Sequence, residues 1–223
     1  MLSLHRGDKM ASVMIHLAVA KEINKTIHQN EKDFLLGAIA PDLSKQIGQT
    51  KERSHFIDMI DDPNQKDIPN LNRFLQKYQS KLDHPFILGY YVHLYTDYLW
   101  FKYFVPEFQH EKSITLLNGE TLPLSRKEGI KYIYNDYTDL NIKLLDAYHM
   151  DLSLFYEPLS LPEIEMDEIP IDQLSILVDK MGVIIQNSKQ QKNYVFNLGQ
   201  VKQFIKTTTE MITSDILEKQ KKL

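Results

Sequence analysis

The sequence predicts a single all-α domain, and three features of the chain lead to this class. Apolar residues recur at three- and four-residue steps over several segments, as on one face of an amphipathic helix. Capping residues precede such segments, as Ser125 followed by Glu128 does before residues 126–149. The 223 residues suffice for one large core, and they contain no internal repeat. We therefore expect one helical, metal-binding domain over residues 10–223, with residues 1–9 as an N-terminal extension.

Composition limits the chemistry that is open to the chain. The net charge of −4, with both signs interspersed, leaves no basic footprint for nucleic acid. Cysteine is absent, which excludes disulfides and thiolate zinc sites and leaves His, Asp and Glu as metal ligands. No apolar run approaches the ~20 residues of a transmembrane helix, and residues 1–10 do not form a signal peptide. We therefore expect a cytoplasmic protein, with Met10 as an alternative start.

The first predicted helix covers residues 12–29. Its apolar face carries Val13, Ile23 and Ile27, and His16 lies on that face rather than among the charged residues. A histidine that faces inward is either a hydrogen-bonded core residue or a metal ligand. The sequence leaves both roles open for His16.

A short apolar helix over residues 31–40 is predicted next, and Pro41 ends it. Gly37 within this helix indicates close packing against a neighbour. Asp42 then either caps the following turn or places a carboxylate at the edge of the core. Residues 43–51 are polar and predicted to form a loop.

The central element is a long buried helix predicted over residues 83–104, with Asp83 as its N-cap. A helix over residues 71–78 leads into it. His93 and Asp97 lie one turn apart on the same face, among apolar and aromatic neighbours. A carboxylate in such surroundings must be paired, protonated or bound to a metal. A plain His–Asp hydrogen bond is the simpler alternative.

The second half is predicted to complete the bundle. Its segments are a turn at residues 119–123, helices over residues 126–149, 172–189 and 199–219, and an irregular crossing over residues 152–170. Asp136 and Asp139 fall outside the apolar stripe of their helix and are predicted to be solvated. His110 and His149, at the ends of their segments, are predicted to be surface residues.

An ordered set of short motifs resembles the zinc-dependent phospholipase C family and its nuclease relatives of the same fold. The set covers residues 10–105 and consists of His16, Pro41-Asp42, Ser54-His55-Phe56, and Gly89-Tyr90-Tyr91-Val92-His93 with Asp97. The resemblance implies an all-helical fold with zinc in a cleft between helices. It implies that one ion is held by Asp42, His55, His93 and Asp97. His16 would bind a second ion, which Asp97 bridges to the first.

The residue types agree with this set. Two imidazoles and two carboxylates match zinc or another first-row divalent ion whose shell is completed by water. Such an ion favours phosphoester hydrolysis, since it polarises a phosphoryl oxygen and lowers the pKa of water. We therefore expect a metal-dependent hydrolase of a small-molecule or lipid phosphoester, with one or two zinc ions. The resemblance adds Asp42 as the general base.

The chain departs from the secreted phospholipases in two respects. Those enzymes carry a further His shortly after the His-x-x-x-Asp motif, and a His and a Glu downstream, for a third metal. Here no His occurs between Asp97 and His110, so we expect the third site to be missing. No Trp lies near the start to provide the N-terminal ligand of the secreted enzymes.

Two other functions were weighed against this hydrolase. A non-catalytic helical protein could use the same residues for a structural metal or a buried His/Asp network. An HD-type phosphohydrolase would need an adjacent His-Asp doublet, whereas this chain has only Asp83-His84, in the reverse order.

Overall fold

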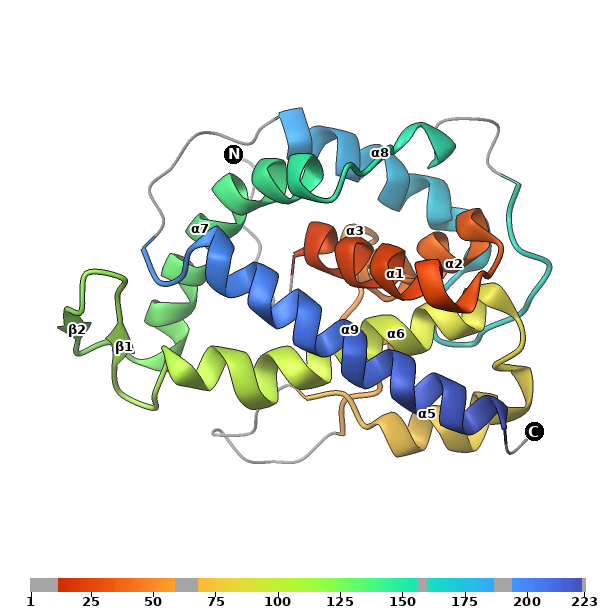
Figure 1. Ribbon diagram of the computed structural model, residues 1–223, viewed down its shortest axis with the longest axis horizontal. Coiled ribbons are helices and arrows are strands. Elements are labelled where there is room, and N and C mark those ends of the chain that lie inside the picture. Colours follow the sequence, from red (N-terminus) through yellow and green to blue (C-terminus); the bar gives the residue numbers. More distant parts are fainter. Residues whose placement is uncertain (1–11, 59–67, 156–159, 187–193, 222–223) are drawn as a thin grey trace.

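The computed structural model describes residues 12–58, 68–155, 160–186 and 194–221, and helices are the main structural elements of these ranges (Figure 1). The helices are α1 (Val13–Ile27), α2 (Glu31–Gly37), α3 (Leu43–Gln46), α4 (Lys51–Ser54), α5 (Leu71–Tyr78), α6 (Pro85–Leu99), α7 (Arg126–Ala147), α8 (Leu174–Gln186) and α9 (Leu198–Gln220). A small antiparallel hairpin pairs β1 (Ile114–Thr115) with β2 (Thr121–Leu122). The predicted all-α class is thereby confirmed. The predicted extension, residues 1–9, lies outside the described residues.

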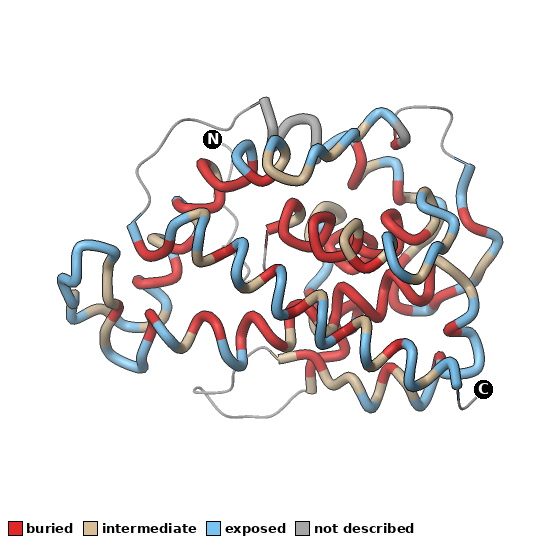
Figure 2. The backbone as a smooth tube through the Cα atoms, in the orientation of Figure 1, coloured by how far each residue is buried: buried red, intermediate tan, exposed pale blue. Residues whose placement is uncertain are grey.

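Helix α6 lies at the centre of the bundle. Helices α1, α2, α5 and α9 all pack against it, and in Figure 1 α9 crosses in front of α6 and lies beside α1. Figure 2 shows α1 and α6 buried along most of their length, whereas α9 alternates buried and exposed positions. A polar side chain on the inner face of α1 or α6 is therefore enclosed by the core. No helix in the described ranges is long and apolar enough to cross a membrane.

Two glycines allow α2 and α6 to touch backbone to backbone. A Cβ atom on Gly37 would lie 2.1 Å from the carbonyl oxygen of Phe86, and one on Gly89 would lie 2.0 Å from that of Phe34. Real Cβ contacts do not occur at these distances, so any side chain here would force the helices apart. The close packing predicted from Gly37 is confirmed. Its consequence is that the end of α2 lies directly beside the middle of α6.

The segment predicted as a helix over residues 83–104 is helical from Pro85 to Phe104, but its predicted N-cap is wrong. Its N-cap is His84 rather than Asp83, because the His84 ring accepts the backbone N–H of Phe86 at 3.2 Å. The α-helix ends at Leu99 and continues as a π-helical turn over Trp100–Phe104. The rings of Trp100 and Phe104 stack on this turn, with centroids 4.3 Å apart. Such a widened turn is rare and often found at functional sites.

The segment between α2 and α4 is more ordered than the sequence indicated. Helix α2 ends at Gly37, and Ala40–Asp42 form a 3₁₀ turn that leads directly into α3. The prediction of a loop over residues 43–51 is therefore wrong for residues 43–46. This compact sequence of short helices fixes the direction in which Asp42 points.

The prediction that Asp136 and Asp139 are solvated is also wrong. The Asp136 carboxylate is fully buried and accepts the backbone N–H groups of Tyr194, Val195 and Phe196 at 2.6–3.1 Å. The segment preceding α9 crosses over this face of α7, so a position outside the apolar stripe is covered by distant residues. Asp139 is buried too, and it pairs with Lys143 at 2.5 Å.

His110 and His149 are exposed, as predicted.

Candidate metal centre

Five buried polar side chains converge between α1, α6 and the short helices after α2. His16 comes from the middle of α1, Asp42 from the 3₁₀ turn before α3, and His55 from the residue after α4. His93 and Asp97 come from consecutive turns of α6. Each of the five is at most 2% exposed. These are the five residues that the sequence predicted as a set, and the structure brings all of them together.

Two imidazole nitrogens and one oxygen of each carboxylate lie close together at the centre of the cluster. The Nε2 atoms of His55 and His93 are 3.2 Å apart, and Asp42 Oδ1 lies 3.5 and 3.9 Å from them. Asp97 Oδ2 lies 3.7 Å from His55 Nε2 and 3.8 Å from His93 Nε2. A tetrahedral zinc ion with bonds of about 2.05 Å requires ligand atoms about 3.3 Å apart. Each carboxylate oxygen therefore lies within metal-ligand spacing of both imidazole nitrogens, at distances a little above the edge of a zinc tetrahedron.

Asp97 faces His16 with its other oxygen. Its Oδ1 lies 3.4 Å from His16 Nε2, while its Oδ2 is the atom that faces His55 and His93. The His16 ring stacks on that of His93, with centroids 3.7 Å apart and planes 12° from parallel. His16, His93 and Asp97 also form a group with metal-ligand spacing. The two oxygens of Asp97 can therefore serve two ions.

The geometry argues against the simpler roles that the sequence left open for His16, Asp42 and the His93–Asp97 pair. Neither ring nitrogen of His16 has a hydrogen-bond partner among the described residues, so His16 is not a hydrogen-bonded core histidine there. Asp42 occupies the N-cap position of α3, but its side chain makes no capping bond. His93 Nε2 and Asp97 Oδ2 are too far apart at 3.8 Å for a hydrogen bond.

Both inner imidazoles are oriented by contacts on the opposite side of the ring. His93 Nδ1 lies 2.8 Å from the carbonyl oxygen of Ala38, which can only accept, so Nδ1 carries the proton. His55 Nδ1 lies 2.9 Å from the hydroxyl of Ser54. A proton on Nδ1 leaves a lone pair on Nε2, directed at the other ligand atoms. This arrangement is usual for metal-binding histidines.

The charges of the cluster also suit a cation. Burial alone would raise the pKa of the Asp42 carboxyl, but its contact with His55 and the neighbouring imidazoles outweigh burial and lower it. Burial would also raise the pKa of the Asp97 carboxyl, but its contact with His16 and the other imidazoles outweighs burial and holds this pKa well below its usual value. Burial, with the stacked His16 ring adding to it, lowers the pKa of His93 to about 3. The carboxylates are thus ionised and His93 is neutral at pH 7, which are the forms that bind metal.

The unsatisfied atoms of the cluster test whether a metal fits. Asp42 Oδ1 and both ring nitrogens of His16 are buried without a hydrogen-bond partner among the described residues. The Nε2 atoms of His55 and His93 face each other at 3.2 Å, so two lone pairs meet when both rings are protonated at Nδ1. One divalent cation would satisfy Asp42 Oδ1 and the two facing Nε2 atoms, and a second cation would satisfy Nε2 of His16. The nitrogen and oxygen donors suit zinc or another first-row ion.

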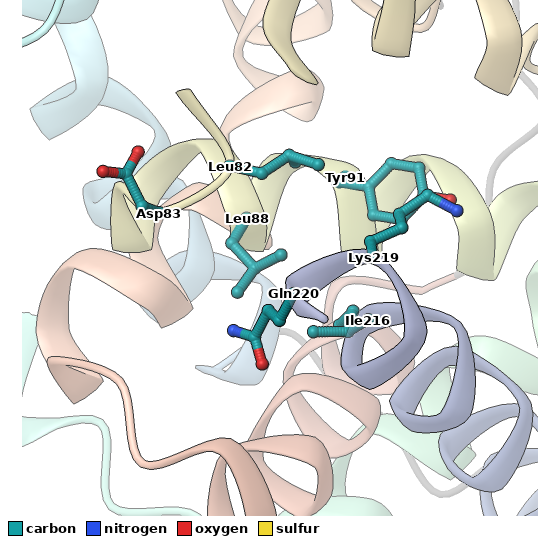
Figure 3. A pocket seen from close by; sticks show the side chains of 7 residues that line it. All are labelled: Leu82, Asp83, Leu88, Tyr91, Ile216, Lys219 and Gln220. Carbon is teal, nitrogen blue, oxygen red and sulfur yellow. The ribbon is translucent and has the colours of Figure 1, made fainter. Parts of the chain in front are cut away.

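An apolar cavity near the start of α6 is a different feature. It has a volume of about 210 Å³ and lies between the start of α6 and the end of α9 (Figure 3). Its lining contains Leu82, Asp83, Leu88, Tyr91, Ile216, Lys219 and Gln220, and none of these belongs to the five-residue cluster. Tyr91 and Lys219 are already bound to Asp215 at 2.8 and 2.5 Å. We therefore locate the candidate chemistry at the buried cluster and not at this cavity.

Sequence reasoning missed the groups that hold the two imidazoles. The Ala38 carbonyl gives no side-chain signal, and Ser54 was noted only as a neighbour of His55. Ser44 was assigned to a loop, yet its hydroxyl lies 2.9 Å from that of Ser54. The position of Ser54 directly before a candidate ligand was the available signal.

Comparison with known proteins gives one match. The family model described as zinc dependent phospholipase C matches residues 11–147. This range contains all five residues of the cluster. No curated protein matches the chain, and no solved structure matches it either.

Proposed function

Because the chain belongs to the zinc-dependent phospholipase C family, we propose that it is a zinc-dependent hydrolase that cleaves a small-molecule or lipid phosphoester. The proposed metal ligands are His16, Asp42, His55, His93 and Asp97. One observation carries the proposal: the Nε2 atoms of His55 and His93 are 3.2 Å apart, and one oxygen of each of the two carboxylates lies 3.5–3.9 Å from both nitrogens, which is metal-ligand spacing. The family match concerns the type of enzyme, and the ligand set is our assignment.

When bound, zinc would polarise the phosphoryl group and make the attacking water more acidic. The protein contributes the orientation of the groups around it. Ala38 and Ser54 hold the rings of His93 and His55 with Nε2 directed inward. Asp97, with one oxygen toward His55 and the other toward His16, would join two ion positions.

We assign Asp42 a second role as general base. Its carboxylate is ionised at neutral pH, because the neighbouring imidazoles lower its pKa, and can therefore accept a proton from water. Because Oδ1 faces the two Nε2 atoms and is the proposed metal ligand, Oδ2 is the oxygen that would take the proton. A carboxylate that is both ionised and available is what this step requires.

The test is phosphoester hydrolysis by zinc-loaded protein. A panel of p-nitrophenyl phosphomonoesters and phosphodiesters, together with phospholipid vesicles, covers the proposed substrate classes. The wild type should hydrolyse at least one of these, and Asp42→Asn should lose that activity. Asp146→Asn, an exposed aspartate on α7, is the matched control and should keep it.

A structural metal centre is the second candidate, and the burial of the cluster favours it. All five side chains are at most 2% exposed, whereas a catalytic metal must be reached by substrate. The hydrolysis panel separates the two functions. Zinc-loaded protein that binds its metal but cleaves no member of the panel would support the structural centre and contradict the hydrolase.

A further inference from the structure

Two buried serines connect the candidate ligands Asp42 and His55. Ser44 lies in α3, two residues after Asp42, and Ser54 ends α4, directly before His55. Both serines are at most 1% exposed. Their Oγ atoms are 2.9 Å apart, and Ser54 Oγ is also 2.9 Å from His55 Nδ1. A continuous chain of hydrogen bonds therefore leads from the His55 ring to the segment that carries Asp42.

The far end of this chain is a backbone carbonyl, which fixes its direction. Ser44 Oγ lies 3.2 Å from the carbonyl oxygen of Pro41, the residue before Asp42. A carbonyl can only accept, and each hydroxyl has a single proton to donate. If Ser44 donates to Pro41, then Ser54 must donate to Ser44. Ser54 then has no proton left for the imidazole, so His55 Nδ1 must donate to Ser54.

The opposite direction satisfies fewer groups. If Ser54 donated to His55 Nδ1, the proton of a neutral ring would lie on Nε2, 3.2 Å from His93 Nε2. Ser44 would then donate to Ser54, and its contact with the Pro41 carbonyl would be lost. The Nε2 atom of His55 would no longer offer a lone pair to a metal. The first direction makes every bond between Pro41 and His55, leaves His55 ready to bind, and gives up only the longer contact of Ser54 with the Lys51 carbonyl oxygen at 3.3 Å.

We propose that Ser54 and Ser44 are positioning residues of the metal centre, which hold the proton of His55 on Nδ1 and tie the Asp42 segment to the His55 segment. This inference rests on the proposed function, because it takes His55 Nε2 to be a metal ligand. The outer hydrogen-bond partners of metal-binding histidines set the ring orientation and affect metal affinity. Here Ser54, the partner of the proposed ligand His55, is itself hydrogen-bonded to Ser44 in the segment that carries Asp42.

The two serines are not equivalent. In Ser54→Ala the His55 Nδ1–H would be buried beside a methyl group and lose its acceptor. In Ser44→Ala the hydroxyl of Ser54 keeps the His55 bond and can donate to the Lys51 carbonyl oxygen at 3.3 Å. Loss of Ser54 should therefore weaken zinc binding by about 10- to 100-fold, and loss of Ser44 by less. The double variant should be no worse than Ser54→Ala, since the effects act through one chain.

Zinc affinity, measured by competition with a chromophoric chelator, tests the order of effects. Thr96→Val is the matched control, because Thr96 is a fully buried hydroxyl on α6 whose hydrogen bond goes to the Val92 carbonyl oxygen of its own helix. Far-ultraviolet circular dichroism verifies that each variant is folded. Zinc binding by a folded Ser54→Ala protein as tight as that of Thr96→Val would overturn the proposal.

The position of the His55 proton gives a second measurement that needs no metal. Long-range ¹H–¹⁵N correlation spectra of the metal-free protein report which ring nitrogen is protonated. A proton on Nδ1 of His55 supports the proposal, and a bare Nδ1 overturns it. If the wild type binds no zinc, the proposed function fails, while this spectrum still decides whether the serines fix the ring.

Discussion

Gly89→Ala should destabilise the protein and loosen the candidate metal centre at the same time. The new Cβ atom would lie 2.0 Å from the carbonyl oxygen of Phe34, and ordinary contact begins at 3.4 Å. The obstacle is backbone, so α2 and α6 must separate locally by about 1.4 Å, the difference between these distances. His93 lies one turn after Gly89 on α6, and its Nδ1 is bonded to Ala38 at the end of α2. Separation of the helices would therefore stretch this 2.8 Å bond.

The expected change in the free energy of unfolding for Gly89→Ala follows from two opposing effects. Overpacking in a rigid contact costs about 1–3 kcal/mol, and more where the backbone must move. Alanine in a helix interior recovers up to about 1 kcal/mol relative to glycine. We therefore expect a net loss of about 2 kcal/mol. For a protein of this size, that corresponds to a fall in Tm of about 4–8 °C.

Thermal unfolding by circular dichroism and the zinc affinity of the folded variant are the two assays. Gly129→Ala is the control, because its Cβ atom would meet the flexible end of Gln109 at 2.7 Å rather than backbone. The control should unfold at a higher temperature than Gly89→Ala and keep the zinc affinity of the wild type. A Gly89→Ala protein as stable as the wild type would refute the close-contact argument.

Two further predictions concern buried charges. Asp136→Ala should lower the free energy of unfolding by at least about 3 kcal/mol, because three backbone N–H groups would lose their acceptor. Denaturant titration measures this loss, with the exposed Asp146→Ala as control. A loss smaller than that of the control would contradict the prediction. The metal-free protein should lose stability as the pH falls from 6.5 towards 3. In the unfolded chain His93 binds a proton over this range, whereas in the folded state its pKa is lowered to about 3 and it stays neutral. For His93 alone, the free energy of unfolding should change by up to about 1.4 kcal/mol per pH unit. Below pH 4, Asp42 and Asp97 should add to this loss, because their pKa values are lowered in the folded state. Denaturant titrations between pH 7 and 4.5 give this slope, and His93→Gln should reduce it; an equal slope in both proteins would rule out His93 as its source.

The helices and the candidate ligands were largely accessible from sequence. Apolar periodicity and capping residues predicted α1, α5, α7 and α9 to within about two residues, as expected for long, strongly patterned segments. The spacing of His93 and Asp97 predicted a buried polar pair. The remaining three residues of the cluster came from the resemblance to a family, because no local pattern brings α1, the turn before α3 and α6 together.

What the sequence could not provide was determined by contacts between distant segments. Asp136 was predicted to be solvated because a helical pattern describes only its own helix, and the groups that bury it lie 58–60 residues away. Gly37 indicated a close neighbour, but only the fold identifies it as the Gly89 region. Ser44 and Ser54 gain their significance from a hydrogen bond between two short helices. Each of these features depends on tertiary packing rather than on local propensity.

Metal content is the measurement that tests the central claim most directly. Tag-free protein, incubated with zinc at neutral pH and desalted, is analysed by plasma mass spectrometry as wild type and as His93→Ala with Asp97→Ala. Asp146→Ala with His149→Ala, an exposed pair at the end of α7, is the matched control. We predict about one or two zinc ions per chain in the wild type and the control, and their loss in the folded His93/Asp97 variant. A wild type without zinc, or a His93/Asp97 variant that is fully loaded, would contradict the proposed metal centre.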